Sequence, residues 1–248
     1  MCTTIMSGFK EKKLLLSTTK QEFLEKMNFH NDDEKDRCEK YLELKGIAYH
    51  VVLANYIGLN RFGKIEYIKV QNLYKYDKRI RNTLYKFIAA FEEGIRAYIS
   101  NKYNNDIDRI KQLSKPLYES VLDDSSLSKE LENQDFYHLM ELAKKLTVEE
   151  KSNLFGTVEN LEGNLDAVRE LRNTVSHHRL LFVYEDYDFC FLEDGTGGDS
   201  LIDNIKNLRQ LIYPYYKDFL KEEINQSSNS IKDSEFKNTL PGKAILKI

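Results

Sequence analysis

The residues best suited to chemistry lie together between Glu170 and Arg179, in the order Glu-Leu-Arg-Asn-Thr-Val-Ser-His-His-Arg. Arg172 offers a planar set of N–H donors that matches the oxygens of a phosphate. His177 brings an imidazole, the side chain type that most readily takes up and releases protons near neutral pH. Together these groups suit cleavage of an RNA phosphodiester by the neighbouring 2′-hydroxyl, which needs a proton acceptor, a proton donor and charge stabilisation but no metal.

The spacing of these residues predicts how they share a helix. Asn173 and His177 are four residues apart and stand on one face, so the Asn amide is expected to hydrogen-bond the imidazole and orient it. Arg172 and His177 are separated by about 140° around the helix, so the guanidinium reaches the same groove only from its flank. An Arg and a His at this spacing also occur by chance, and a His at a helix end often binds carbonyls, so a structural role for His177 stays open.

A long amphipathic helix is predicted to begin near Val70 and to end near Asn104, because apolar residues recur there at steps of three and four. Glu92 and Arg96 lie four residues apart on it, in the order that favours a salt bridge. Glu92 also borders the apolar stripe, where a partly buried carboxylate needs a cation. Arg172 is therefore a second candidate partner for Glu92, and in that case Glu92 orients the guanidinium.

Helix start signals elsewhere complete an all-α fold. Thr19 with Glu22, and Thr147 with Glu150, have the spacing of capping boxes. Residues 114–128 are expected to form a loop, residues 131–146 a helix, and Pro214 a kink in the last long helix, which opens at Ser200. We expect an N-terminal helical region over residues 1–68, a helical domain over residues 69–225 and a flexible tail over residues 226–248.

The composition of the 248 residues is that of a globular protein, with 41% apolar residues, 31% charged residues and a net charge of −3. Cys2, Cys38 and Cys190 are too few and too scattered for a disulfide framework, which favours a cytoplasmic location. No spacing typical of a metal site occurs, and neither a metal nor another cofactor is expected. The most apolar stretch, residues 46–59, is too short to span a membrane.

Charge is distributed unevenly along the chain. Residues 61–115 carry 13 Lys and Arg against six Asp and Glu, and residues 116–170 carry five against 13. The basic segment is a candidate surface for RNA, with Arg79 and Arg81 as the candidate RNA-binding residues. The alternative is that two oppositely charged surfaces pack on one another.

Four stretches of the chain resemble the Abi-like (abortive infection, AbiD/AbiF-type) bacterial proteins of the HEPN superfamily. They are Leu44–Ile47, Leu73–Arg81, Ile88–Arg96 and Leu171–His178. The resemblance implies a HEPN-like helical bundle with additional N-terminal helices, and a homodimer in which two Arg–His motifs face each other. It implies that Arg172, Asn173 and His177 are catalytic. We expect Glu92, Arg96 and His178 to support them; a simple intrahelical pair of Glu92 and Arg96 and a His178 that only faces solvent stay open as alternatives.

The resulting expectation is a metal-independent endoribonuclease of a phage-defence or toxin–antitoxin system, with RNA as substrate and an RNA or protein antitoxin as a further partner. Two other functions stay open at this point. The same fold can bind RNA or a nucleotide without cleaving it, or it can serve as a scaffold that docks a protein through the acidic residues 116–170.

Overall fold

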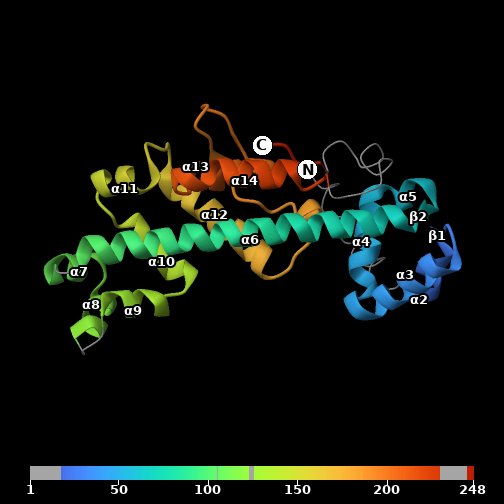
Figure 1. Ribbon diagram of the computed structural model, residues 1–248, viewed down its shortest axis with the longest axis horizontal. Coiled ribbons are helices and arrows are strands. Elements are labelled where there is room, and N and C mark those ends of the chain that lie inside the picture. The colour runs from blue at the N-terminus through green and yellow to red at the C-terminus, as the bar shows by residue number, and fades with distance from the viewer. Residues whose placement is uncertain (1–17, 105, 123–125, 230–244) are drawn as a thin grey trace, which may run out of the picture. The chain divides into compact units, whose positions relative to one another are not determined.

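The computed structural model describes residues 18–104, 106–122, 126–229 and 245–248, and the described chain is mainly helical (Figure 1). The predicted all-α fold is confirmed. The chain divides into two compact units, one made of residues 1–79 and 227–245 and the other of residues 80–226 and 246–248. The long predicted helix, α6 (Tyr67–Tyr103), is continuous and contributes to both units. The division therefore falls inside this helix rather than between residues 68 and 69, where the sequence placed it.

The first unit combines short helices with one pair of parallel strands. Its elements are α2 (Lys20–Glu25), β1 (Met27–Asn28), α3 (Asp32–Lys45), α4 (Ile47–Ile57), α5 (Leu59–Phe62), β2 (Ile65–Glu66) and the start of α6. The predicted capping box of Thr19 and Glu22 opens α2. Gly46 separates α3 from α4 with a φ of 83°, a conformation that favours glycine. His50 is buried between the rings of Tyr67 and Tyr74, and its Nδ1 lies 3.0 Å from the carbonyl oxygen of Gly46.

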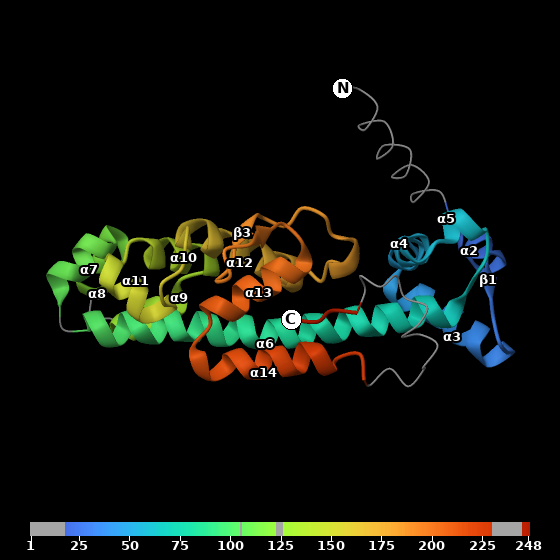
Figure 2. The ribbon, with the colours of Figure 1, turned by 90° about the horizontal axis from the view of Figure 1, so that it is seen from above.

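The second unit is built on the C-terminal part of α6. Its other elements are α7 (Ile107–Leu113), α8 (Lys115–Leu122), α9 (Leu127–Asn133), α10 (Phe136–Lys144), α11 (Val148–Phe155), α12 (Leu161–Ser176), the 3₁₀ turn η1 (Leu181–Val183), β3 (Cys190–Phe191), β4 (Gly197–Gly198), α13 (Leu201–Leu211) and α14 (Pro214–Gln226). Figure 2 shows α14 along one side of α6 and α12 along the other. Helix α12 packs against both α10 and α13. The core of this unit includes Leu165, Val168 and Leu171 of α12 and Ile88 and Ile95 of α6, all of which are buried.

Three local predictions are corrected. Residues 114–128 are not one loop, because α8 and α9 form there and bury Leu117 and Leu127. The helix expected over residues 131–146 is divided, because Asp135 accepts a hydrogen bond from the backbone N–H of His138 and starts α10. Pro214 does not kink a continuous helix: α13 ends at Leu211 and Pro214 begins α14, where its missing N–H costs no hydrogen bond.

A buried network of amide side chains holds β3 against α12 and α13. Asn164 is fully buried, and its side chain donates to the carbonyl of Phe191 over 3.0 Å and accepts from the N–H of Phe191 over 2.8 Å. Asn207 donates to the carbonyl of Asn164 over 2.9 Å, and Gln210 donates to the carbonyl of Phe191 over 2.6 Å. These side chains satisfy backbone groups that the two-residue strand β3 leaves unpaired.

Both described ends of the predicted flexible tail contain residues that are buried or hydrogen-bonded to α14. Ser227 and Ser228 are buried after α14, and Leu246 is buried near the other end of the chain. The N–H of Ile248 donates to Oδ1 of Asn225 over 2.9 Å, and Nδ2 of Asn225 donates back to the carbonyl of Ile248 over 3.0 Å. Residues 230–244 of the predicted tail lie outside the described residues.

Across the part of the chain that the structure describes, no helix combines the length and the hydropathy needed to cross a bilayer.

Candidate functional site

The sequence block that contains Arg172 and His177 lies at the C-terminal end of α12. The helix ends in a Schellman motif, in which the N–H of Arg179 donates to the carbonyl of Thr174 and the N–H of His178 donates to the carbonyl of Val175, both over 3.1 Å. His177 is the C-cap residue, with φ −84° and ψ 9°, and its backbone N–H donates to the carbonyl of Asn173 over 2.9 Å. The chain therefore turns sharply away from the helix immediately after the histidines.

This ending exposes the imidazole of His177 and alters the predicted contact with Asn173. Both His177 and His178 are exposed, and Asn173 is half-buried one turn earlier. The Asn173 amide does not form the predicted hydrogen bond with the His177 ring. Only the backbones of these two residues are hydrogen-bonded to each other. The imidazole thus remains accessible from solvent.

His178 has a structural role that is unusual for a histidine. It occupies the left-handed region with a φ of 55°, at the position of a Schellman motif where glycine is usual. Its carbonyl oxygen accepts a hydrogen bond from Nη1 of Arg81 over 3.1 Å. Arg81 is only 8% exposed, so its burial leaves little of its surface for RNA. The backbone of His178, rather than its ring, connects the end of α12 to α6.

Arg79, the other candidate RNA-binding residue, lies in the first unit. Its Nη1 donates to the carbonyl of Ser227 over 3.0 Å, and its side chain is half-buried. Part of its hydrogen-bonding capacity is therefore used to hold the backbone that follows α14.

Arg172 is half-buried and lies over an aromatic ring instead of beside a carboxylate. The centre of its guanidinium is 5.3 Å from the centroid of Phe136, a cation–π distance. No described carboxylate lies within ion-pair distance of it, and none of its N–H groups donates a hydrogen bond to a described residue. A guanidinium held in this way keeps its in-plane donors for an anionic ligand.

Glu92 pairs with Arg96 and not with Arg172, so the intrahelical alternative is the one that forms. Oε1 of Glu92 lies 2.5 Å from Nη2 of Arg96, and the same nitrogen lies 2.8 Å from the carbonyl oxygen of Gln134. Both side chains are mostly buried. Arg96 on α6 binds the backbone of Gln134 just before α10. Two residues later, Phe136 contacts Arg172 on α12. Side chains from α6 and α12 therefore meet at this turn.

A second group, which the sequence gave no reason to single out, holds the segment after the motif. Nη1 of Arg179 lies 3.0 Å from the hydroxyl of Tyr184 and 3.5 Å from Oε1 of Glu170, and the Tyr184 hydroxyl donates to the same Glu170 oxygen. Burial and the hydrogen bond to Glu170 raise the pKa of Tyr184. Arg179 thus has a carboxylate partner, unlike Arg172. The turn at His178 brings Arg179 and Tyr184 back to Glu170, which precedes them by nine and fourteen residues.

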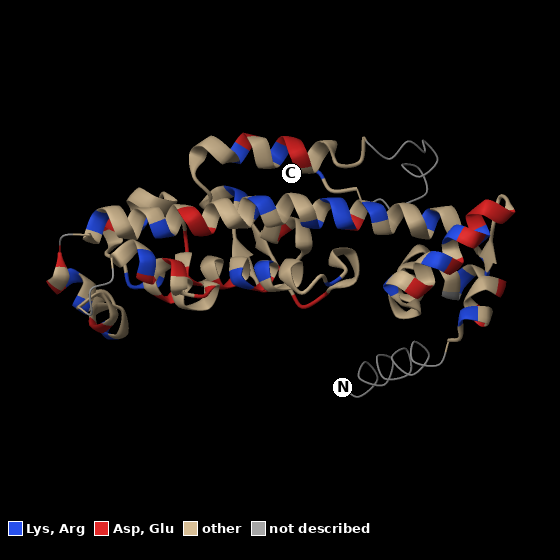
Figure 3. Cartoon of the chain, turned by 60° about the horizontal axis from the view of Figure 1, so that its bottom comes forward, with Lys and Arg blue, Asp and Glu red and all other residues tan. Residues whose placement is uncertain are grey.

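The wider electrostatics differ between α6 and the segment that contains β3. Helix α6 has eight Lys and Arg against three Asp and Glu, and Figure 3 shows these basic residues over many of its turns. Residues 184–200 have six Asp and Glu and no Lys or Arg. Several of the α6 cations are paired or buried, namely Lys69, Lys86, Arg96 and Arg81, whereas the acidic segment 184–200 would repel a polyanion.

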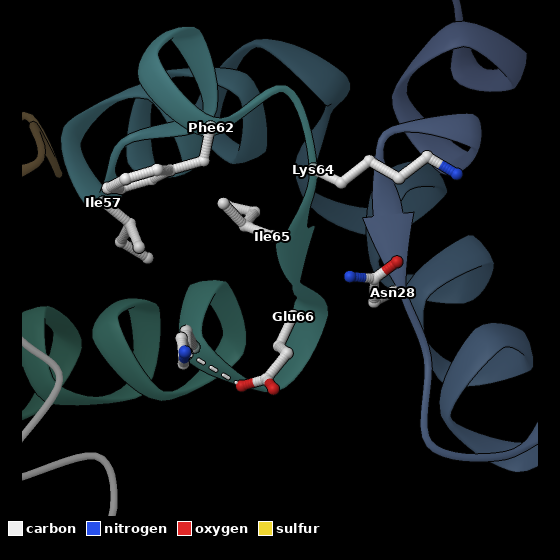
Figure 4. A pocket seen from close by; sticks show the side chains of 7 residues that line it. Asn28, Ile57, Phe62, Lys64, Ile65 and Glu66 are labelled. Atoms are coloured by element: carbon white, nitrogen blue, oxygen red, sulfur yellow. Dashed lines mark ion pairs between the residues drawn. The ribbon is translucent and has the colours of Figure 1, made fainter.

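Two of the hollows formed by the described residues lie away from the motif. One, in the first unit, has a volume of about 390 Å³ and is lined by Asn28, Ile57, Phe62, Lys64, Ile65, Glu66 and Lys69 (Figure 4). Figure 4 shows the apolar side chains of Ile57, Phe62 and Ile65 close to one another, and Glu66 in an ion pair with Lys69. The other, in the second unit, is mainly apolar and lies between α6 and the ends of α11 and α13. Among the residues that can be described, no three His, Cys, Asp or Glu side chains gather as metal ligands.

Comparison with known proteins yields no match to a family model, to a curated protein or to a solved structure.

Proposed function

We propose that the chain is a metal-independent endoribonuclease of the Abi-like class of HEPN proteins, acting in the cytoplasm in phage defence or as the toxin of a toxin–antitoxin pair. The observation that carries the proposal is the end of α12. There an exposed His177 follows, within five residues, an Arg172 whose guanidinium has no carboxylate partner among the described residues. A proton-transfer group and an available phosphate-binding group are the two requirements of cleavage by the 2′-hydroxyl.

In this mechanism the substrate supplies its own nucleophile. An imidazole removes the proton of the 2′-hydroxyl, whose oxygen attacks the adjacent phosphorus, and the bond from phosphorus to the 5′-oxygen breaks. A second proton donor protonates the leaving 5′-oxygen, which leaves a 2′,3′-cyclic phosphate and a 5′-hydroxyl. Arg172 stabilises the additional negative charge of the phosphorane.

A homodimer provides both the base and the acid. Each copy brings one exposed His177, so the two imidazoles can perform the two proton transfers in one site. The separation of about 140° between residues 172 and 177 is then no obstacle, because the Arg172 of one copy serves the His177 of the other. Asn173, which lies one turn before His177, is proposed to orient the imidazole. Glu92 and Arg96 support the turn before α10, where the Phe136 ring contacts Arg172.

The test is cleavage of end-labelled single-stranded RNA in excess EDTA. We expect the wild type to produce 2′,3′-cyclic phosphate ends, and His177→Ala and Arg172→Ala to lose about 10²-fold or more in rate. His178→Ala and Arg179→Ala are matched controls that remove the neighbouring histidine and a neighbouring, carboxylate-paired arginine, and both should cleave nearly as fast as the wild type. Equal rates in the wild type, His177→Ala and Arg172→Ala would refute the assignment.

One observation favours a second candidate, an RNA-binding or nucleotide-binding module without catalysis. The His177 ring has no described hydrogen-bond partner, whereas catalytic imidazoles are usually oriented by one. RNA binding that depends on Arg172 but not on His177, with no cleavage by the wild type, would select this function. Expression in bacteria distinguishes the two as well, since only a nuclease should be toxic in a manner that requires His177.

A further inference from the structure

Arg172 belongs to a polar stripe that extends toward the start of α12. Arg169, Arg172 and Ser176 follow one another at steps of three and four residues and share one face of the helix. All three are partly exposed, whereas Val168, Leu171 and Val175 on the other face are buried. The surface around Arg172 therefore continues for at least one further turn.

The two arginines of the stripe rest on two adjacent aromatic rings at the start of α10. The guanidinium centre of Arg172 lies 5.3 Å from the Phe136 ring, and that of Arg169 lies 5.5 Å from the Tyr137 ring. Contact with a ring occupies the face of a guanidinium and leaves its edge for hydrogen bonds. Helix α10 thus holds two arginines one helical turn apart in the same manner.

The carboxylates nearby do not fully neutralise these cations. Oδ1 of Asp166 lies 3.0 Å from Nη1 of Arg169, but the same oxygen lies 2.7 Å from Nζ of Lys144. Lys144 also pairs with Glu141 over 2.8 Å. Arg169 and Lys144 therefore share the carboxylate of Asp166, Asp188 also interacts electrostatically with Arg169, and Arg172 has no described carboxylate partner.

We infer that Arg169 and Arg172 form a two-phosphate subsite for single-stranded RNA, in which Arg169 binds the phosphate next to the one held by Arg172. Three residues of helix separate the two positions by about 4.5 Å along the axis, a distance that two long side chains adjust to neighbouring phosphates of one strand. Tyr137, which is 51% exposed, positions Arg169. The nature of the ligand rests on the proposed function, because that function identifies Arg172 as a phosphate-binding residue.

The experiment uses a 2′-O-methyl RNA hexamer, which lacks the nucleophilic hydroxyl and cannot be cleaved, and a series of hexamers in which one phosphate at a time is a neutral methylphosphonate. Affinity is measured by fluorescence anisotropy. For the wild type we expect two adjacent linkages at which neutralisation weakens binding about tenfold, equal to about 1.4 kcal/mol each. Arg169→Ala should remove the sensitivity at one of them, and Arg172→Ala should remove it at the other.

Controls separate a phosphate contact from a general loss of charge or of folding. Arg179→Ala removes a nearby arginine that is paired with Glu170, and it should retain both sensitive linkages. Tyr137→Leu should weaken the sensitivity assigned to Arg169 and leave the other unchanged. Unchanged thermal unfolding and circular dichroism spectra verify the fold of each variant.

The outcomes distinguish this inference from the proposed function. If Arg169→Ala keeps both sensitive linkages, or if the wild type shows one sensitive linkage or none, the subsite is refuted. If the expected pattern appears while unmodified RNA stays intact, the subsite stands and the nuclease proposal fails. If the hexamer does not bind, the subsite is refuted, and the nuclease proposal is decided by the cleavage of unmodified RNA alone.

Discussion

Replacing His178 by glycine is expected to stabilise the protein, whereas the same change at the adjacent His177 is expected to destabilise it. The two histidines are both exposed, but His178 has a φ of 55° and His177 a φ of −84°. A left-handed backbone costs a non-glycine residue about 1–2 kcal/mol, which glycine avoids. Glycine also gains about 0.5–1 kcal/mol of conformational freedom in the unfolded chain, which opposes folding at either position.

The balance gives His178→Gly a gain of roughly 0.5–1 kcal/mol and His177→Gly a loss of similar size. The gap between the variants is then about 1–2 kcal/mol, or roughly 3–6 °C in Tm for a chain of this length. The contact with Arg81 should survive in His178→Gly, because it uses the backbone carbonyl of residue 178.

Thermal unfolding of the wild type and both variants at pH 7.5 measures this gap, and urea unfolding with unchanged m-values verifies that the variants unfold in the same way. Equal destabilisation by both substitutions would refute the account of the helix end. Labelled RNA adds a second comparison, since His178→Gly should retain any cleavage that His177→Gly loses.

Two further predictions concern the packing that surrounds the site and the first unit. Asn164→Ala should lower the free energy of unfolding by roughly 2–4 kcal/mol, because it removes a fully buried side chain that pairs with both backbone groups of half-buried Phe191, whereas Asn133→Ala on the surface should change it by less than about 0.5 kcal/mol in urea unfolding. Burial lowers the pKa of His50, so the folded state binds fewer protons at this residue than the unfolded state does. The folded state therefore loses stability as the pH falls below the unfolded pKa of about 6.5. His50→Gln should therefore make stability less dependent on pH between 7 and 5, and an unchanged slope would contradict this reasoning.

The sequence predicted those helices whose signals are local. The capping boxes at Thr19 and Thr147, the break at Gly46 and the extent of α6 all agree with the structure, because caps and helical periodicity act within a few residues. Helices α8 and α9 were missed, since their formation depends on burying Leu117 and Leu127 against the rest of the second unit. A short helix with polar residues around it resembles a loop until its packing partners are known.

The candidate site divides in the same way. Residue types and spacing predicted one helix for Arg172 and His177 and left Arg96 and Arg172 as alternative partners of Glu92. The structure places Arg172 inside α12 and His177 at its C-cap, and pairs Glu92 with Arg96. The contact between Arg172 and Phe136, by contrast, joins residues that are 36 positions apart, so no local sequence pattern predicts it. The buried position of Arg81 also depended on the tertiary fold.

The amide network around Asn164 has a consequence for the acid-rich residues 184–200. Asn164, Asn207 and Gln210, which attach its β3 portion to the helices, have neutral side chains that do not titrate. The attachment of this acidic segment therefore does not depend on ion pairs and is not weakened by salt. Salt can screen the field that its carboxylates exert on a polyanion without loosening the backbone that carries them.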